Sequence, residues 1–169
     1  MAEPTHLVIF DADRIKDFVF ATGRLKEIRG GSQLVRDGSD AEQLKENLGL
    51  TDEEIVFAEG GAGVLQFTER ERAEEKARAL ERFYRTVTHG ATLTAVVQSA
   101  ASFREAKQAG DRRLRMAKED RRRRWQTAHS PFSRACESCG ARPAVMNYEP
   151  SGVPLCEWCY AKRTRSDDA

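Results

Sequence analysis

The most specific chemical pattern in the sequence is a set of four cysteines toward its end. They form two Cys-x-x-Cys pairs, Cys136 with Cys139 and Cys156 with Cys159, separated by the segment 140–155. Two such pairs at this spacing bind one zinc ion tetrahedrally through four thiolates. Because protein then fills all four positions, the zinc has no open position for substrate and is expected to be structural. Four unrelated free cysteines are the alternative.

A second candidate site lies near the start of the chain, where Asp11 and Asp13 follow the apolar run 7–10. A buried strand that delivers carboxylates at its C-terminal end can build a metal-dependent phosphate site. Carboxylate oxygens suit Mg²⁺, which also takes ligands from substrate phosphates. We therefore predict Asp11 and Asp13 as candidate catalytic residues and Asp11 as a candidate magnesium ligand. The alternative is that one of the two only caps the following helix.

A basic segment precedes the cysteines. Between residues 104 and 124 arginine and lysine outnumber aspartate and glutamate, and the run 121–124 is unbroken arginine followed by Trp125. Such a patch can bind phosphate backbones, which makes RNA a candidate partner. The alternative is a solvated helix face with acidic neighbours. The predicted nucleic-acid patch consists of Arg112, Arg113, Arg115, Arg121, Arg122, Arg123 and Arg124.

Strands and helices must position these residues, and hydrophobic periodicity predicts their order. Gly30-Gly31-Ser32 is expected to break or bend the first helix. The glycines of the turn 60–63 allow positive φ and join two strands in a hairpin. Asp40 and Gly49 are expected to begin and end a short helix. The predicted elements are strand 7–10, a helix that reaches Ile28, a helix at 40–48, strands 54–59 and 64–67, a helix at 69–84, strand 91–97 and a helix at 102–128.

The order strand, helix, strand, strand, helix, strand is that of the ferredoxin-like split βαβ arrangement. The predicted fold class is therefore α+β, with a βαββαβ unit whose antiparallel sheet carries helices on one face. A four-cysteine zinc module follows it. We expect the βαββαβ unit and its basic C-terminal helix to occupy residues 1–128, the zinc module 129–165 and a tail 166–169.

Composition narrows the function classes. The chain has 169 residues and a formal net charge of +1, so nucleic-acid affinity has to come from a local patch. No apolar run reaches the about 18 residues that suggest a membrane span. The first residues have neither the basic region nor the apolar core of a secretion signal. We therefore expect a cytoplasmic protein without a membrane partner, in which the cysteines favour metal over disulfides.

Several of these motifs together resemble a known family. The segment 11–16, the Gly60-Gly61 hairpin and the pattern Asp111-x-x-Leu-x-x-Ala-Lys118 are similar to the GGDEF and nucleotide-cyclase palm. More narrowly, the chain resembles the first palm domain and zinc module of the large polymerase-like subunit of type III CRISPR effector complexes. The carrying segments, besides the hairpin and the Ala-Lys helix, are 15–32, 136–145 and 155–163.

The resemblance implies roles for the matching residues. In that family the first aspartate binds catalytic metal, the Gly-Gly turn holds the nucleotide and the late lysine contacts the triphosphate. Ala62 and Gly63 stand where an active palm has two acids after the glycines, so whether the chain is an enzyme stays open. The resemblance assigns binding of ATP or another nucleotide to Asp11, Ser32, Gly60, Gly61 and Lys118.

The leading hypothesis is a degenerate, non-catalytic, nucleotide-binding palm of a cyclic oligonucleotide synthetase connected with CRISPR antiviral defence. It would work with a partner palm or with effector subunits. One alternative is a stand-alone homodimeric nucleotide cyclase or oligonucleotide synthetase that uses Asp11, Asp13 and a further ligand. Another is a zinc-containing scaffold adaptor that binds nucleic acid through the arginine patch.

Overall fold

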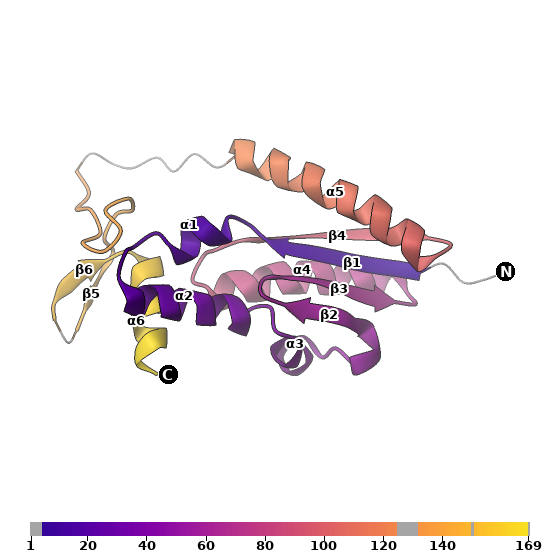
Figure 1. Ribbon diagram of the computed structural model, residues 1–169, viewed down its shortest axis with the longest axis horizontal. Coiled ribbons are helices and arrows are strands. Elements are labelled where there is room, and N and C mark those ends of the chain that lie inside the picture. The colour runs from indigo at the N-terminus through magenta and orange to yellow at the C-terminus, as the bar shows by residue number, and fades with distance from the viewer. Residues whose placement is uncertain (1–4, 125–131, 150, 169) are drawn as a thin grey trace.

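The computed structural model of the chain describes residues 5–124, 132–149 and 151–168, with the side chains of 121–124 outside the description (Figure 1). Its centre is an antiparallel sheet of four strands in the order β2-β3-β1-β4. This is the order of the split βαβ arrangement, so the predicted α+β fold class is confirmed. The strands are β1 (Thr5–Ala12), β2 (Ile55–Glu59), β3 (Ala62–Phe67) and β4 (Leu93–Ala100).

Four helices share one hydrophobic core with one face of the sheet. They are α1 (Ile15–Val19), α2 (Leu25–Asp37), α3 (Ala41–Leu48) and α4 (Arg70–Val87). The apolar stripe of α4 is buried as its helical period requires, with Leu80 and Tyr84 at most 1% exposed. The 3₁₀ turn η1 (Asp52–Glu54) leads from α3 into β2. The βαββαβ unit therefore carries these helices on one side, as predicted.

The ends of α3 confirm the predicted boundaries. The Asp40 carboxylate accepts a hydrogen bond from the backbone N–H of Glu42 at 3.1 Å, which satisfies one of the free donors of the first turn. Gly49 ends the helix with a φ of 62°, a left-handed conformation in which glycine meets no Cβ penalty. Both signals are local, so the sequence alone was enough to place them.

The predicted helix that reaches Ile28 is not a single helix in the structure. It is divided into α1 and α2, because Gly23 disfavours helix and the Thr22 hydroxyl accepts a hydrogen bond from the Arg24 N–H at 3.1 Å. The expected break at Gly30-Gly31-Ser32 is wrong, because α2 continues through all three residues. These glycines serve instead to let another helix approach, as described below.

The fifth helix, α5 (Phe103–Arg124), covers the opposite face of the sheet. The expectation of helices on one face thus holds for the βαββαβ unit and not for the helix that follows it. Gly110 permits the close packing, since a Cβ there would lie 2.2 Å from Ile9 Cδ1. Burial on both faces explains why the predicted strand 7–10 is a continuous apolar run, at most 3% exposed. Residues 125–128 of the predicted helix lie outside the described residues.

The edge strand β4 is hydrogen-bonded by side chains from both helical layers. The backbone N–H of Ala95 donates to Glu81 Oε1 of α4 at 3.0 Å. Arg113 Nη1 of α5 donates to the backbone oxygen of Val97 at 2.9 Å. Two backbone groups at this edge therefore have side-chain partners in place of a neighbouring strand.

The C-terminal part consists of the hairpin β5 (Met146–Tyr148) and β6 (Val153–Leu155), followed by α6 (Glu157–Asp167). α6 packs against α2, as Figure 1 shows. It includes the first two residues of the predicted tail 166–169, whereas Ala169 and the predicted boundary at 128–129 lie outside the described residues. Within the part of the chain that is described, no helix is both long and apolar enough to cross a membrane.

Candidate zinc and nucleotide sites

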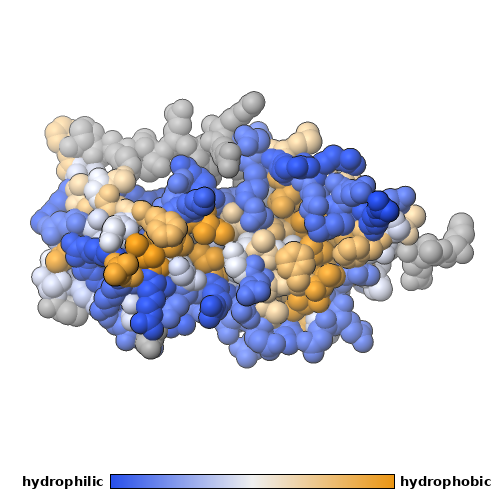
Figure 2. Space-filling model, viewed as in Figure 1, coloured by the Kyte–Doolittle hydropathy of each residue, from blue (hydrophilic) through white to orange (hydrophobic). Residues whose placement is uncertain are grey.

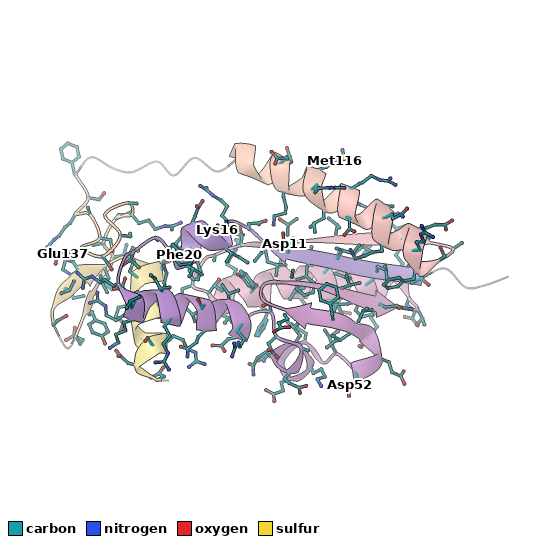
Figure 3. All side chains as sticks on the ribbon, viewed as in Figure 1. Asp11, Lys16, Phe20, Asp52, Met116 and Glu137 are labelled. Atoms are coloured by element: carbon teal, nitrogen blue, oxygen red, sulfur yellow. The ribbon has the colours of Figure 1, made fainter. Side chains whose placement is uncertain are left out.

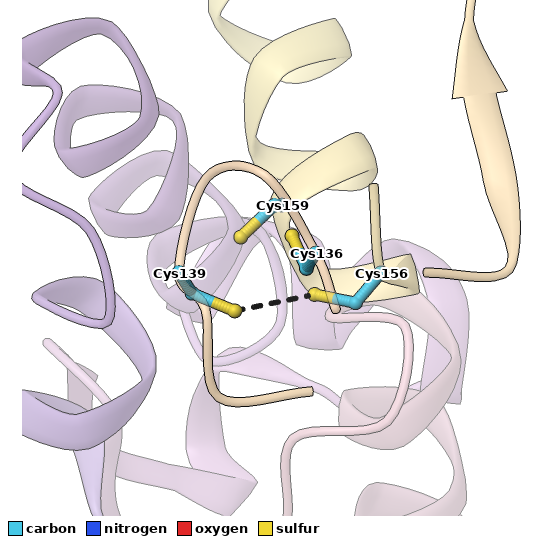
Figure 4. A group of neighbouring side chains, drawn as sticks. All are labelled: Cys136, Cys139, Cys156 and Cys159. Atoms are coloured by element: carbon cyan, nitrogen blue, oxygen red, sulfur yellow. Dashed lines mark hydrogen bonds between the residues drawn. The ribbon is translucent and has the colours of Figure 1, made fainter. Parts of the chain in front are cut away.

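The four cysteines converge on one point, as the spacing predicts (Figure 4). Their Sγ atoms all lie within 4.8 Å of one another, and the Sγ atoms of Cys139 and Cys156 are 3.8 Å apart. Tetrahedral zinc with Zn–S bonds of about 2.3 Å requires S–S distances of about 3.8 Å. The donor set and its spacing therefore fit a zinc ion, and an ion held by four protein ligands would be structural rather than catalytic.

Two tight local structures present the thiols. In the first pair the backbone N–H of Gly140 donates to the Cys136 oxygen at 2.9 Å, and Gly140 has a φ of 66°. A residue other than glycine would be strained in that left-handed turn. In the second pair Cys156 is the N-terminal flanking residue of α6 and Cys159 lies in its first turn. The chain thus brings the thiols of a loop and of a helix start to the same point.

Hydrogen bonds between the thiols shift the pKa values of Cys156 and Cys159 in opposite directions. The side chain and then the backbone N–H of Cys159 bond to Cys156 and lower its pKa to about 5, although burial opposes this. The same side-chain bond and burial raise the pKa of Cys159, which holds the shared proton. Zinc binding would therefore have to displace the proton from Cys159, since a thiol binds the metal as the thiolate.

A buried ion pair joins the cysteine module to α2. Arg163 of α6 donates to Glu27 Oε1 through Nε at 3.0 Å and through Nη2 at 2.5 Å. The Glu27 side chain is 1% exposed, and its second oxygen accepts a hydrogen bond from the Ser138 hydroxyl. Lys162 donates to the backbone oxygen of Phe18, and burial lowers its pKa. Sequence analysis missed these residues, because charged residues on a helix are normally expected at its surface.

The predicted carboxylates lie at the end of β1, where α5 crosses it (Figure 3). Lys118 of α5 pairs with Asp11 and donates to the backbone oxygen of Ala12 at 2.9 Å. The ammonium also lies 3.7 Å from Asp13 Oδ1. Asp13 accepts the Thr94 hydroxyl at 2.9 Å and 3.0 Å through its two oxygens. Three of the predicted site residues, Asp11, Asp13 and Lys118, are thus brought together.

Buried Tyr84 of α4 has a raised pKa, chiefly because of its burial and additionally because of the negative charges of Asp13 and Asp11. A phenol of ordinary pKa is already protonated at neutral pH, and the raised pKa of Tyr84 extends this to more alkaline conditions.

The Gly60-Gly61 turn lies beside the same end of β1. Gly60 and Gly61 have φ values of 61° and 94°, which suits a two-residue hairpin of left-handed residues. The Gly61 oxygen accepts the Ala12 N–H at 2.7 Å, and its own N–H donates to the buried Ser39 hydroxyl at 2.9 Å. A Cβ on Gly61 would lie 2.7 Å from Ile15 Cδ1, whereas one on Gly60 would meet nothing within 4 Å. Gly61 is therefore a packing residue and Gly60 offers open backbone.

Ser32 is the predicted nucleotide-binding residue on α2. It is exposed on α2, and its hydroxyl donates to the Ile28 oxygen of the same helix at 3.1 Å. Among the described contacts none joins Ser32 to Asp11, Lys118 or the glycine turn. Its role at the nucleotide site stays a prediction.

The predicted arginine patch is only partly described. Arg112, Arg113 and Arg115 are exposed on α5, and Arg113 is engaged with the backbone of β4. The side chains of Arg121, Arg122, Arg123 and Arg124 lie outside the described residues. A continuous basic surface therefore stays a prediction.

Comparisons with known proteins agree with a palm fold. No protein-family model matches the sequence, and no curated protein matches it. Among solved structures, the crystal structure of Csm1 from T. onnurineus matches with a TM-score of 0.51 and 20% sequence identity. The match covers 70% of this chain and 20% of that chain. The chain thus has a Csm1-like palm fold with a four-cysteine module, and it spans about a fifth of the length of the protein it matches.

Proposed function

We propose that this chain is a degenerate, non-catalytic palm that binds ATP or another nucleotide within a CRISPR-related oligonucleotide synthetase. The observation that carries the proposal is the pairing of Asp11 with Ala62 across the β1–β3 ladder. An active site of this type needs a second carboxylate after the two glycines to position metal and activate the attacking hydroxyl. Here a methyl group stands directly opposite the first carboxylate, so the chain lacks half of that machinery.

The remaining features suit a nucleotide. The open backbone at Gly60 leaves room for a ligand to approach, and Lys118 supplies a positive charge at the adjacent end of β1. The resemblance of the sequence motifs assigns Asp11, Ser32, Gly60, Gly61 and Lys118 to nucleotide binding, and the Csm1-like fold supports this assignment. Magnesium, if it takes part, would arrive with the phosphates, since Mg²⁺ commonly keeps ligands from substrate phosphates.

A partner has to complete the site. The proposal assigns that part to a protein that carries a catalytic palm or to other effector subunits. Exposed apolar side chains support a docking role, since Phe20 directly after α1 and Leu25 at the start of α2 are 64% and 81% exposed. Figure 2 shows apolar surface there and over the strands below α5, where Val56 and Phe57 of β2 are also exposed.

ATP binding and turnover by the purified chain test the proposal. We expect saturable binding of ATP and no cyclic or linear oligonucleotide by mass spectrometry, with Mg²⁺ or with Mn²⁺. The variant Lys118→Met should weaken binding, whereas Lys107→Met on the same helix, which removes a cation paired with Asp111, should not. Product formation that Asp11→Asn abolishes would contradict the proposal and favour a homodimeric enzyme. A chain that binds no nucleotide would also contradict it.

The exposed Arg112 and Arg115 favour a second candidate function, an adaptor that binds RNA. Phosphate contacts of arginine make such binding salt-dependent. An RNA affinity that survives Asp11→Asn and Lys118→Met, but falls when Arg121 to Arg124 are neutralised, would support the adaptor over the nucleotide-binding palm.

A further inference from the structure

Lys118 occupies an unusual position for a residue expected to contact a phosphate. We propose that its ammonium is a built-in cation that takes the place of a divalent metal between Asp11 and Asp13. The inference deepens the proposed function and rests on it in one respect. If a nucleotide binds at this palm, it binds without a metal ion held by the carboxylates at the end of β1.

The contacts of the ammonium are those of a bound cation. Three oxygens surround it: a carboxylate oxygen of Asp11, the backbone oxygen of Ala12 at 2.9 Å and a carboxylate oxygen of Asp13 at 3.7 Å. Two carboxylates and a carbonyl are also the kind of oxygen set that Mg²⁺ or Mn²⁺ accepts. The lysine ammonium therefore occupies the position that a metal ion would take among these oxygens.

The position of the ammonium is fixed by the packing of α5. The Lys118 side chain is 17% exposed, and that of Asp13 is 12% exposed. Ala106, Gly110 and Leu114 precede Lys118 at spacings of four residues and are buried on the sheet. The helix face that is docked on the sheet thus delivers the lysine to the end of β1, between the partly exposed Asp11, at 42%, and the less exposed Asp13.

Charge explains why a metal and this lysine exclude each other. Two carboxylates and one ammonium leave a single negative charge at the site. A divalent ion among the same oxygens would lie within a few ångströms of the ammonium, and at that distance two cations repel each other strongly at the effective dielectric of a protein surface. An acid at position 62 would have offset this charge, but Ala62 stands there opposite Asp11.

Manganese binding measured without nucleotide tests the inference. Free Mn²⁺ is followed by its electron paramagnetic resonance signal as it is titrated into zinc-loaded protein, because the hard Mn²⁺ ion does not compete well for four thiolates. We expect Lys118→Met to bind one Mn²⁺ at least about tenfold more tightly than the wild type, a difference of about 1.4 kcal/mol. Asp11→Asn in the Lys118→Met background should remove that site.

Two controls make the result specific. Lys107→Met removes a cation of the same helix that is paired with Asp111 and should leave Mn²⁺ binding at the wild-type level. Lys118→Arg keeps the charge and should gain no site. Circular dichroism and the melting temperature show whether each variant is folded, and Lys118→Gln serves as the neutral replacement if the methionine variant is not.

Wild-type protein that binds Mn²⁺ through Asp11 as tightly as the Lys118→Met variant would overturn the inference. So would folded Lys118→Met and Lys118→Gln variants that gain no site. Failure of ATP binding in the presence of the expected Mn²⁺ results would instead overturn the proposed function and leave the role of Lys118 intact, since the metal titration contains no nucleotide.

Discussion

Gly30 of α2 lies so close to Lys162 of α6 that a Cβ on the glycine would be 1.8 Å from the lysine backbone oxygen. The contact is with backbone, so no side-chain rotation can relieve it. It places the cysteine module directly on the helical layer of the palm. The two parts therefore depend on each other for stability, and several predictions can be made from this contact and from the nearby charges.

Gly30→Ala should separate α2 from α6. Forcing atoms into a packed contact costs about 1–3 kcal/mol, which exceeds the about 1 kcal/mol that alanine gains over glycine inside a helix. Urea unfolding should therefore show a net loss of stability. Gly23→Ala is a control outside this contact and outside the helices, because a Cβ there meets nothing within 4 Å. A Gly30→Ala variant as stable as the control would show that the two helices do not pack as described.

The buried pair of Glu27 and Arg163 should show strong coupling. Removing either partner leaves an uncompensated buried charge, which costs about 3–5 kcal/mol. We expect Glu27→Leu and Arg163→Met each to destabilise the protein by about that amount, and the double variant to lose less than the sum. Urea unfolding of the four proteins measures the coupling. Additive losses would mean that the two side chains do not pair in solution.

Zinc removal should affect more than the cysteine module. We expect about one zinc per chain by elemental analysis, its loss in Cys159→Ser, and a lower melting temperature, because α6 loses its anchor while it packs on α2. Glu157→Gln changes an exposed neighbour and should keep the zinc. An unchanged melting temperature in zinc-free Cys159→Ser would indicate that the palm folds independently of the module.

Zinc affinity should fall as the pH is lowered, because protons compete with zinc for the thiolates. The raised pKa of Cys159 keeps it protonated at neutral pH in the metal-free protein, so zinc binding releases its proton and the apparent affinity rises with pH. A chelator competition at about pH 6 and pH 8 measures this, and these values bracket neutrality within the range in which proteins are usually most stable. Equal affinities at both pH values would argue against thiolate ligation.

The ion pair of Glu54 with Arg72 should contribute stability that depends on pH. The hydrogen bond from Arg72 lowers the pKa of Glu54 below its usual value. A carboxyl with a lowered folded pKa stabilises the native state above its unfolded pKa, and this contribution is lost as the pH falls through the folded pKa. Glu54→Gln should thus lower the stability of the protein at neutral pH and have little effect on it at acidic pH. Thermal unfolding at both pH values measures this.

The parts of the fold that the sequence predicted are those set by local pattern. The buried strand 7–10, the capping by Asp40 and the stop at Gly49 depend on residues close in sequence, and the structure confirms them. The convergence of the cysteines was predicted from the spacing of the two Cys-x-x-Cys pairs, which is that of a zinc site, and the structure shows the four thiols together. The side of the sheet that α5 covers was not predicted, because it depends on contacts formed only in the folded chain.

In the candidate sites, too, the features that the sequence did not predict depend on residues far apart in the chain. The glycines at 30 and 31 resemble a helix break when only the sequence is considered, and their use for close packing depends on Lys162, far away in the chain. The burial of Glu27 likewise depends on Arg163. Lys118 was assigned to the site by family resemblance and not by any local signal, and its ion pair with Asp11 forms only when α5 packs on the sheet.

The side-chain hydrogen bonds at β4 hinder the association of copies of this molecule through that strand edge. Ala95 and Val97 direct backbone groups to Glu81 and Arg113, so another strand could add at this edge only by displacing both side chains. Open strand edges are the usual template for pairing with a strand of another chain, which leads to aggregation and amyloid. The two helices that hold the sheet thus also act as a barrier to fibril growth from this side.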